Sequence, residues 1–193
     1  MAVLTMPDPP TATLAAEYDD SLYEVVDGVR VEIPPMSVFT SIIAARLHTP
    51  MYSFATQHRL GTAAMEVLFI FDPIRNRRRR PDVAFVTAAR WPLDREFPQT
   101  GDWEVVPNLA VEVISPSEIF NEVLTKAHEY FKYGVEQVWL VISAVRQVYI
   151  YDSPTCVRIL GDEDTIDGIG LLPGFQLPVA QLFHRAPLNG KPA

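Results

Sequence analysis

One stretch of the sequence, residues 108–134, constrains the fold more than any other. It reads NLAVEVISPSEIFNEVLTKAHEYFKYG, an apolar run followed by a helical pattern. The near-continuous apolar residues over 109–114 predict a strand that is covered on both faces. Glu112 lies in the middle of this strand, and burying an unpaired carboxylate is costly. The carboxylate therefore needs a partner or a function, unless the strand is an edge that turns Glu112 to solvent.

A helix is expected directly after this strand. Residues 115–118 (SPSE) have the pattern of a capping box, with serine as N-cap, proline at the first helical position and glutamate three residues after the cap. Glu122 and Lys126 share one face of that helix, and both could reach Glu112 if the helix folds back over the strand. An ordinary surface ion pair between Glu122 and Lys126 is the alternative interpretation.

Two structural features are predicted before the arginine-rich segment. The dipeptide Asp27-Gly28 separates two strand patterns within residues 23–33 and suits a two-residue hairpin turn. Ser37 is placed to cap a helix whose apolar residues recur at helical spacing up to residue 54. A hairpin followed by a helix is therefore expected.

The next segment combines apolar and basic residues. Residues 63–71 read as one strand, in which Glu66 could face solvent. A turn-rich loop then runs into a short strand at Pro81-Asp82, and the two strands could form a hairpin with a basic tip; its arginines are residues 75, 77, 78, 79 and 80. Such a run is most often a solvated loop, but it is the only dense cationic cluster in an acidic chain, and arginine suits bidentate contact with phosphate.

The remaining pattern and the size of the chain indicate one domain. Residues 137–142 (QVWLVI) predict a second buried strand beside the first, and Cys156 is expected to be a buried apolar residue. The order of elements predicts an α/β or α+β sandwich around a mixed sheet. With 193 residues, we expect a flexible leader over 1–17, a single domain over 18–185 and a flexible tail over 186–193.

Composition limits the classes of function. The formal net charge of −8 argues against a broad nucleic-acid-binding surface, although it leaves room for local contact. No apolar run is long enough to span a bilayer, and the first residues lack the pattern of a secretory signal. We therefore expect a cytoplasmic protein without membrane contact.

Two carboxylates and a lysine form the candidate site. Asp82 begins one strand, Glu112 lies inside the next major strand, and Lys126 lies on the following helix. Carboxylate oxygens are hard ligands that suit Mg²⁺ or Mn²⁺, and a bound divalent metal can activate water for phosphodiester hydrolysis. A buried ion network that only fixes the fold is the alternative.

Several segments together resemble the Uma-two family of restriction endonucleases, which is part of the PD-(D/E)XK nuclease superfamily. The segments are RRPDVAFV, NLAVEVISPSE and K-x-x-x-Y-x-x-x-GV-x-x-x-WLV, and with both ends of the domain the resemblance covers residues 22–183. It implies a restriction-endonuclease-like core, in which a mixed β-sheet is flanked by helices and preceded by an N-terminal β-hairpin.

The resemblance also implies roles for particular residues. Asp82 and Glu112 would bind Mg²⁺ or Mn²⁺, with the carbonyl of Val113 as a further ligand. In the superfamily pattern, the lysine lies two residues after the glutamate, where this chain has Ile114. The resemblance implies that in this family the lysine lies instead on the following helix, at Lys126.

Supporting acidic positions and two departures complete the resemblance. Glu66 and Glu122 fall near positions that are commonly acidic in the family. Family members often have histidine where this chain has Phe39-Thr40, and an aspartate where it has Ile142. These departures bear on catalytic competence more than on fold.

The sequence therefore predicts a divalent-metal-dependent endonuclease, with DNA as the expected substrate and Arg79 and Arg80 in contact with the nucleic-acid backbone. The resemblance further implies a homodimer. The alternative is a catalytically inactive, nuclease-like binding or assembly module, also homodimeric, which would need no metal.

Overall fold

The computed structural model describes residues 21–99 and 101–183. Its main sheet is mixed and has six strands, with β7 (Leu109–Ile114) among the inner ones. The strand order is β10-β9-β8-β7-β6-β3. Strand β7 pairs in parallel with β8, and the other neighbours are antiparallel. The other strands are β3 (Gly61–Met65), β6 (Val83–Thr87), β8 (Gln137–Ile142), β9 (Gln147–Ser153) and β10 (Cys156–Leu160).

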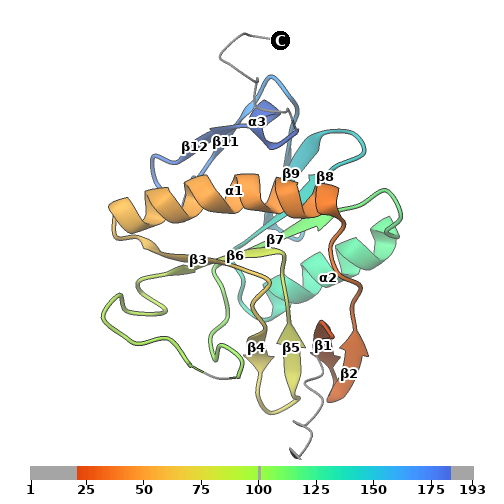
Figure 1. Cartoon of the computed structure of the whole chain (residues 1–193), viewed down its shortest axis with the longest axis vertical. Coiled ribbons are helices and arrows are strands. Elements are labelled where there is room, and N and C mark those ends of the chain that lie inside the picture. The colour runs from red at the N-terminus through yellow and green to blue at the C-terminus, as the bar shows by residue number, and fades with distance from the viewer. Residues whose placement is uncertain (1–20, 100, 184–193) are drawn as a thin grey trace, which may run out of the picture.

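Helix α2 (Phe120–Lys132) connects the two parallel strands, as a parallel pair requires. It covers one face of the sheet, and helix α1 (Val38–Gln57) covers the other (Figure 1). All six residues of β7 are buried between these layers, as the apolar run predicts.

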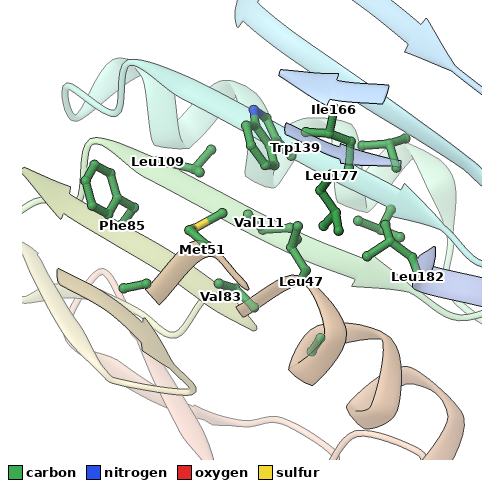
Figure 2. Close-up of a cluster of buried hydrophobic side chains, with 14 of the residues drawn as sticks. Leu47, Met51, Val83, Phe85, Leu109, Val111, Trp139, Ile166, Leu177 and Leu182 are labelled. Carbon is green, nitrogen blue, oxygen red and sulfur yellow. The ribbon is translucent and has the colours of Figure 1, made fainter. Parts of the chain in front are cut away.

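Helix α1 forms where its pattern predicts. The Oγ atom of its N-cap, Ser37, accepts a hydrogen bond of 3.2 Å from the backbone N–H of Thr40. Figure 2 shows the apolar face of the helix, with Leu47 and Met51, packed against the side chains of the central strands. This core also takes in the C-terminal elements β11 (Thr165–Asp167), β12 (Gln176–Pro178) and α3 (Ala180–Phe183).

A four-stranded sheet in the order β2-β1-β5-β4 lies beside the main sheet (Figure 1). Its strands are β1 (Tyr23–Val26), β2 (Val29–Glu32), β4 (Phe69–Asp72) and β5 (Arg77–Arg79). The predicted N-terminal hairpin is confirmed, with Asp27 and Gly28 in its turn at φ angles of 49° and 80°. Such positive angles are what a tight two-residue turn demands.

The start of α2 differs from the prediction. The helix begins at Phe120 and not at residue 116, and its N-cap, Ile119, makes no side-chain capping bond. The Ser115 N–H does donate to the Glu118 carboxylate at 2.7 Å, but this bond closes a separate turn. Because Ile119 is extended (ψ 112°), the turn cannot continue into the helix.

The single strand expected over residues 63–71 is also wrong, because Glu66 has a φ angle of 49°. This left-handed residue ends β3 and lets the chain enter β4 in the other sheet. The basic segment consequently forms β5 opposite β4, so that three of its arginines lie within a strand and not at a hairpin tip. Cys156, expected to be buried, is exposed on β10.

The boundaries expected for the leader (1–17) and the tail (186–193) lie outside the described residues. Among the described helices, none is long and apolar enough to cross a membrane.

Neighbouring isoleucines on α1 provide a test of this packing. Ile43 is 0% exposed and Ile42 is 45% exposed. We expect Ile43→Ala to lower the free energy of unfolding by about 2–5 kcal/mol, because it removes buried methyl groups and leaves a cavity, and Ile42→Ala to lower it by less than about 1 kcal/mol. Urea denaturation of both variants measures the difference, and equal losses would contradict the assigned face of α1.

Candidate active site

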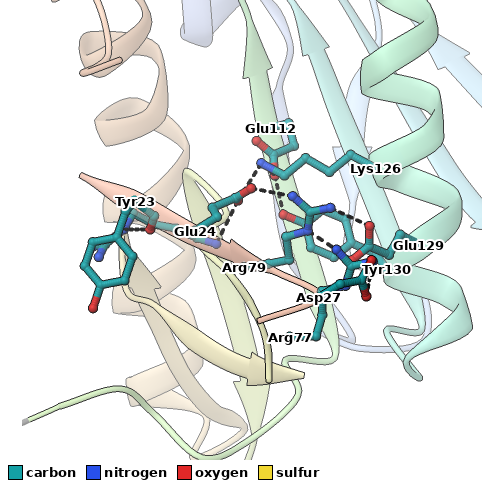
Figure 3. A network of polar contacts seen from close by, with 10 residues as sticks. Tyr23, Glu24, Asp27, Arg77, Arg79, Glu112, Lys126, Glu129 and Tyr130 are labelled. Atoms are coloured by element: carbon teal, nitrogen blue, oxygen red, sulfur yellow. Dashed lines mark hydrogen bonds and ion pairs between the residues drawn. The ribbon is translucent and has the colours of Figure 1, made fainter. Parts of the chain in front are cut away.

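The predicted carboxylate and lysine meet where β7 and α2 lie against each other. Glu112 is only 8% exposed, and the Nζ atom of Lys126 lies 3.0 Å from its Oε1 atom. The Tyr130 hydroxyl, one helical turn after Lys126, donates to the same oxygen at 2.5 Å (Figure 3). A cation and a hydroxyl from α2 therefore compensate the carboxylate that β7 buries.

Asp82 lies next to this pair, directly before β6. Its Oδ2 atom accepts a hydrogen bond of 2.6 Å from the backbone N–H of Val113, the residue after Glu112. Asp82, Glu112 and Lys126 all line a depression of about 400 Å³. The structure thus brings together the three residues that the sequence singled out.

A third carboxylate, Glu24 of β1, completes the cluster. Its Oε1 atom lies 3.0 Å from Lys126 Nζ and accepts a hydrogen bond of 3.0 Å from the backbone N–H of Arg80. Its Oε2 atom accepts a hydrogen bond of 2.5 Å from Arg79 Nη1. At 4% exposure it is as enclosed as the core. Sequence reasoning missed Glu24, and the only signal was one acidic residue in an otherwise apolar strand pattern over residues 23–26.

The surroundings shift the pKa values of the three carboxyl groups in different directions. Burial and the charge of Glu112 raise the pKa of Asp82 to about 8, against the Val113 hydrogen bond and Lys126, which lower it. Burial also raises the pKa of Glu112, although Lys126 opposes this shift. For Glu24, burial raises the pKa but the cations Lys126 and Arg79 outweigh it, so that its pKa is lowered.

Lys126 is held in its charged form. Burial alone would lower the pKa of this ammonium group, but Glu112 and Glu24 outweigh burial and raise the pKa above its ordinary value. At neutral pH, Lys126 is therefore a hydrogen-bond donor and cannot accept a proton.

Two further acidic residues lie apart from this cluster. Glu122 is exposed on α2 and makes no ion pair within the described residues, so the surface pair proposed as an alternative for Lys126 does not form. Glu66 engages the region through its backbone, because its carbonyl accepts a hydrogen bond from Arg80 Nη1. Supporting roles for their carboxylates stay predictions.

The arginine run is not a solvated loop, except for Arg75, which is exposed in the turn between β4 and β5. Arg79 lies between Glu24 and Glu129, and its Nε atom donates to Glu129 Oε1 at 3.0 Å. The Arg80 guanidinium contacts backbone carbonyls, and Arg78 pairs with Asp102. Contact of Arg79 and Arg80 with nucleic acid stays a prediction, although each lines one of two depressions that flank Lys126.

The two positions at which this chain departs from the family that it resembles lie in different surroundings. Thr40 is buried, lines the depression that contains Asp82, and donates its hydroxyl to the Ser37 carbonyl at 3.1 Å. Ile142 ends β8 opposite Ile114 and is absent from the lining of that depression. A supporting acid at position 142 would therefore lie outside the walls around Asp82.

The carboxylate oxygens of the site can be compared with the ligands that a divalent metal needs. Among residues 21–99 and 101–183, no three His, Cys, Asp or Glu side chains group as a metal cluster. Asp82 and Glu112 nevertheless each commit one oxygen to the protein, which leaves Asp82 Oδ1 and Glu112 Oε2 without a hydrogen-bond partner in the described part of the chain. Two carboxylates with free oxygens suit Mg²⁺, which keeps several waters and shares its remaining positions with phosphate.

Comparison with known proteins finds a matching family model and similar solved structures. The Uma2 family model, described as "putative restriction endonuclease", matches residues 10–180. A crystal structure described as "a putative nuclease belonging to DUF820", from Anabaena variabilis ATCC 29413, has a TM-score of 0.70 and 17% sequence identity, covering 83% of this chain and 89% of that chain. No curated protein matches the sequence. The likeness to the solved structure shows a shared fold and confirms the predicted mixed sheet flanked by helices.

The raised pKa of Asp82 predicts how stability depends on pH in metal-free buffer. An aspartate in the unfolded chain loses its proton near pH 4, whereas Asp82 in the folded protein keeps it to about pH 8. The folded state therefore binds more protons across this window, and the free energy of unfolding falls as pH rises through it.

We expect Asp82→Asn to flatten this fall, because asparagine cannot ionise and its oxygen can still accept the Val113 N–H. Urea denaturation from pH 5 to 8 measures the effect. Glu163→Gln, which alters an exposed carboxylate between β10 and β11, is the matched control and should keep the wild-type slope. An unchanged slope in Asp82→Asn would contradict the assignment.

Proposed function

Because the chain belongs to the Uma2 family, we propose that it is a divalent-metal-dependent endonuclease that hydrolyses phosphodiester bonds in DNA. One observation carries the proposal: Asp82 and Glu112 line the same depression as Lys126, and each has one oxygen free of hydrogen bonds within the described residues. Two acids and a cation at one open surface suit phosphodiester chemistry better than structural support, which would favour complete pairing.

Asp82 and Glu112 would hold Mg²⁺ or Mn²⁺, with the Val113 carbonyl as a further ligand. When bound, the metal supplies Lewis acidity, which lowers the pKa of water and offsets the charge of the phosphate. The raised pKa of Asp82 supports this role, because two desolvated carboxyl groups at close range gain from a shared cation.

Lys126 would act as a charged donor. Its ammonium is held between Glu112 and Glu24, each at 3.0 Å, and these carboxylates keep it protonated. Among the roles open to this lysine, orienting the attacking water and stabilising the negative charge of the phosphate are therefore favoured over deprotonating the water.

The substrate would approach along the two depressions on either side of Lys126. Arg79 lines one and Arg80 the other, so that both could contact the nucleic-acid backbone if their present hydrogen bonds are exchanged for phosphate. The net charge of −8 keeps such contact local. A homodimer, with one site for each strand, and a cytoplasmic location complete the proposal.

Metal binding and cleavage provide the first test. We expect wild type to bind Mn²⁺ in calorimetry and to nick plasmid DNA with Mg²⁺ or Mn²⁺, and Asp82→Asn to lose both, because one of two ligand carboxylates becomes a neutral amide. Glu163→Gln, at a distant exposed position, should behave as wild type. A folded wild type that binds no metal would contradict the nuclease proposal and favour the inactive binding module.

Lys126 separates metal binding from cleavage. We expect Lys126→Met to retain Mn²⁺ binding but to cleave DNA about 100-fold or more slowly, because a positioned charge that stabilises the transition state is lost. Lys126→Arg, which keeps the charge, should recover part of the rate. Thermal melting of both variants identifies any loss caused by unfolding, and a Lys126→Met rate equal to wild type would exclude the catalytic role.

A further inference from the structure

Glu24 binds neither the metal nor the substrate in the reaction proposed above, yet its carboxylate is the most fully bound of the cluster. It has three donors, namely the Lys126 ammonium and the Arg80 N–H at 3.0 Å each and the Arg79 guanidinium at 2.5 Å. Its two oxygens are thus both occupied, unlike those of Asp82 and Glu112. This arrangement suits a residue that holds another group in place and not one that binds a metal.

We propose that Glu24 is a positioning residue, which fixes the Lys126 ammonium beside Glu112 so that the N-terminal hairpin completes the reaction centre. The inference rests on the proposed function for its catalytic consequence. Glu24 lies on β1 of the four-stranded sheet, whereas Glu112 and Asp82 belong to the region of the main sheet. Glu24 therefore adds the N-terminal hairpin to the site.

The geometry explains why Lys126 needs a second anchor. A lysine side chain is long and flexible, and a defined ammonium position requires contacts on more than one side. Glu112 supplies one such contact, but its attraction for Lys126 weakens once its charge is shared with a metal ion. Glu24 holds no metal in the proposal, because both of its oxygens are bound by the protein, and its contact with Lys126 therefore does not depend on the metal.

Glu24 is itself held by a chain of alternating charges. Glu129 of α2 binds Arg79, Arg79 binds Glu24, and Glu24 binds Lys126, which returns to α2 (Figure 3). The hairpin, β5 and α2 are tied together by these contacts. A purely structural role for Glu24, as a partner of Arg79 alone, is therefore the alternative that an experiment must separate.

Glu129 provides a matched control for that purpose. Like Glu24, it is a largely buried glutamate that binds Arg79, but it makes no contact with Lys126. Glu24→Gln and Glu129→Gln thus remove the same charge from the same guanidinium. Only Glu24→Gln weakens the hold on Lys126.

The first measurement is plasmid cleavage at saturating Mn²⁺, with kcat and KM determined separately. We expect Glu24→Gln to lower kcat by about 10- to 100-fold with KM and Mn²⁺ affinity near wild type, as for a misplaced catalytic group. Glu129→Gln should keep kcat within about twofold of wild type while melting at a similarly lowered temperature. Equal losses of kcat in both variants, or none in Glu24→Gln, would overturn the proposal.

The second measurement needs no nuclease activity. Lysine acetylation by isotopically labelled acetic anhydride, quantified by mass spectrometry, compares Lys126 with Lys132, which is exposed on the same helix. We expect slower acetylation of Lys126 in wild type, and about a threefold or larger rise in the Lys126-to-Lys132 rate ratio in Glu24→Gln but not in Glu129→Gln, because only the first loses a charged partner of Lys126.

The two measurements separate two failures. If wild type does not cleave DNA but Lys126 loses its protection only in Glu24→Gln, the proposed nuclease function fails and the anchoring of Lys126 by Glu24 stands. If the rate ratio is the same in both variants, the anchoring fails whatever the cleavage assay shows.

Discussion

The buried carboxylate of Glu112 is the constraint on which the rest of the structure depends. A strand covered on both faces leaves no water for an ionised group, so its charge must be matched from the protein. Lys126 and Tyr130 of α2 provide that match, and both reach the same oxygen of Glu112. The ammonium of Lys126 also contacts Glu24, and this contact ties the N-terminal hairpin to α2.

Within the described residues, the carboxyl group of Asp82 is not matched by a cation in the way that Glu112 and Glu24 are. Its carboxyl group has one backbone donor, lies close to the charge of Glu112, and has a pKa raised to about 8. A site selected for stability alone would replace it with an apolar residue or give it a cation of its own. An acid left in this condition at the wall of a depression is typical of a site that binds a positive ligand.

The sequence predicted those features that depend on local pattern. The apolar run of β7, the Asp27-Gly28 turn and the Ser37 cap all arise from neighbours in the chain, and all form. Glu24 could not be placed, because its pairing with Lys126 depends on how two sheets meet. The start of α2 was misjudged for a different reason: Glu118 makes its expected bond to Ser115 N–H, but that bond also suits a closed turn.

The unusual place of the lysine also has a physical explanation in the sheet. Alternate residues of a strand share a face, so Ala110, Glu112 and Ile114 point the same way. Ala110 and Ile114 pack in the cluster that contains Val123 and Ala127 of α2, whereas Val111 packs in the cluster of α1. A lysine at position 114 and a lysine on α2 would therefore approach Glu112 from the same side of the sheet. With Ile114 buried beneath the helix, the cation comes from the helix itself. Glu112 thereby keeps its positive partner, and β7 keeps an apolar run on either side of its one charge.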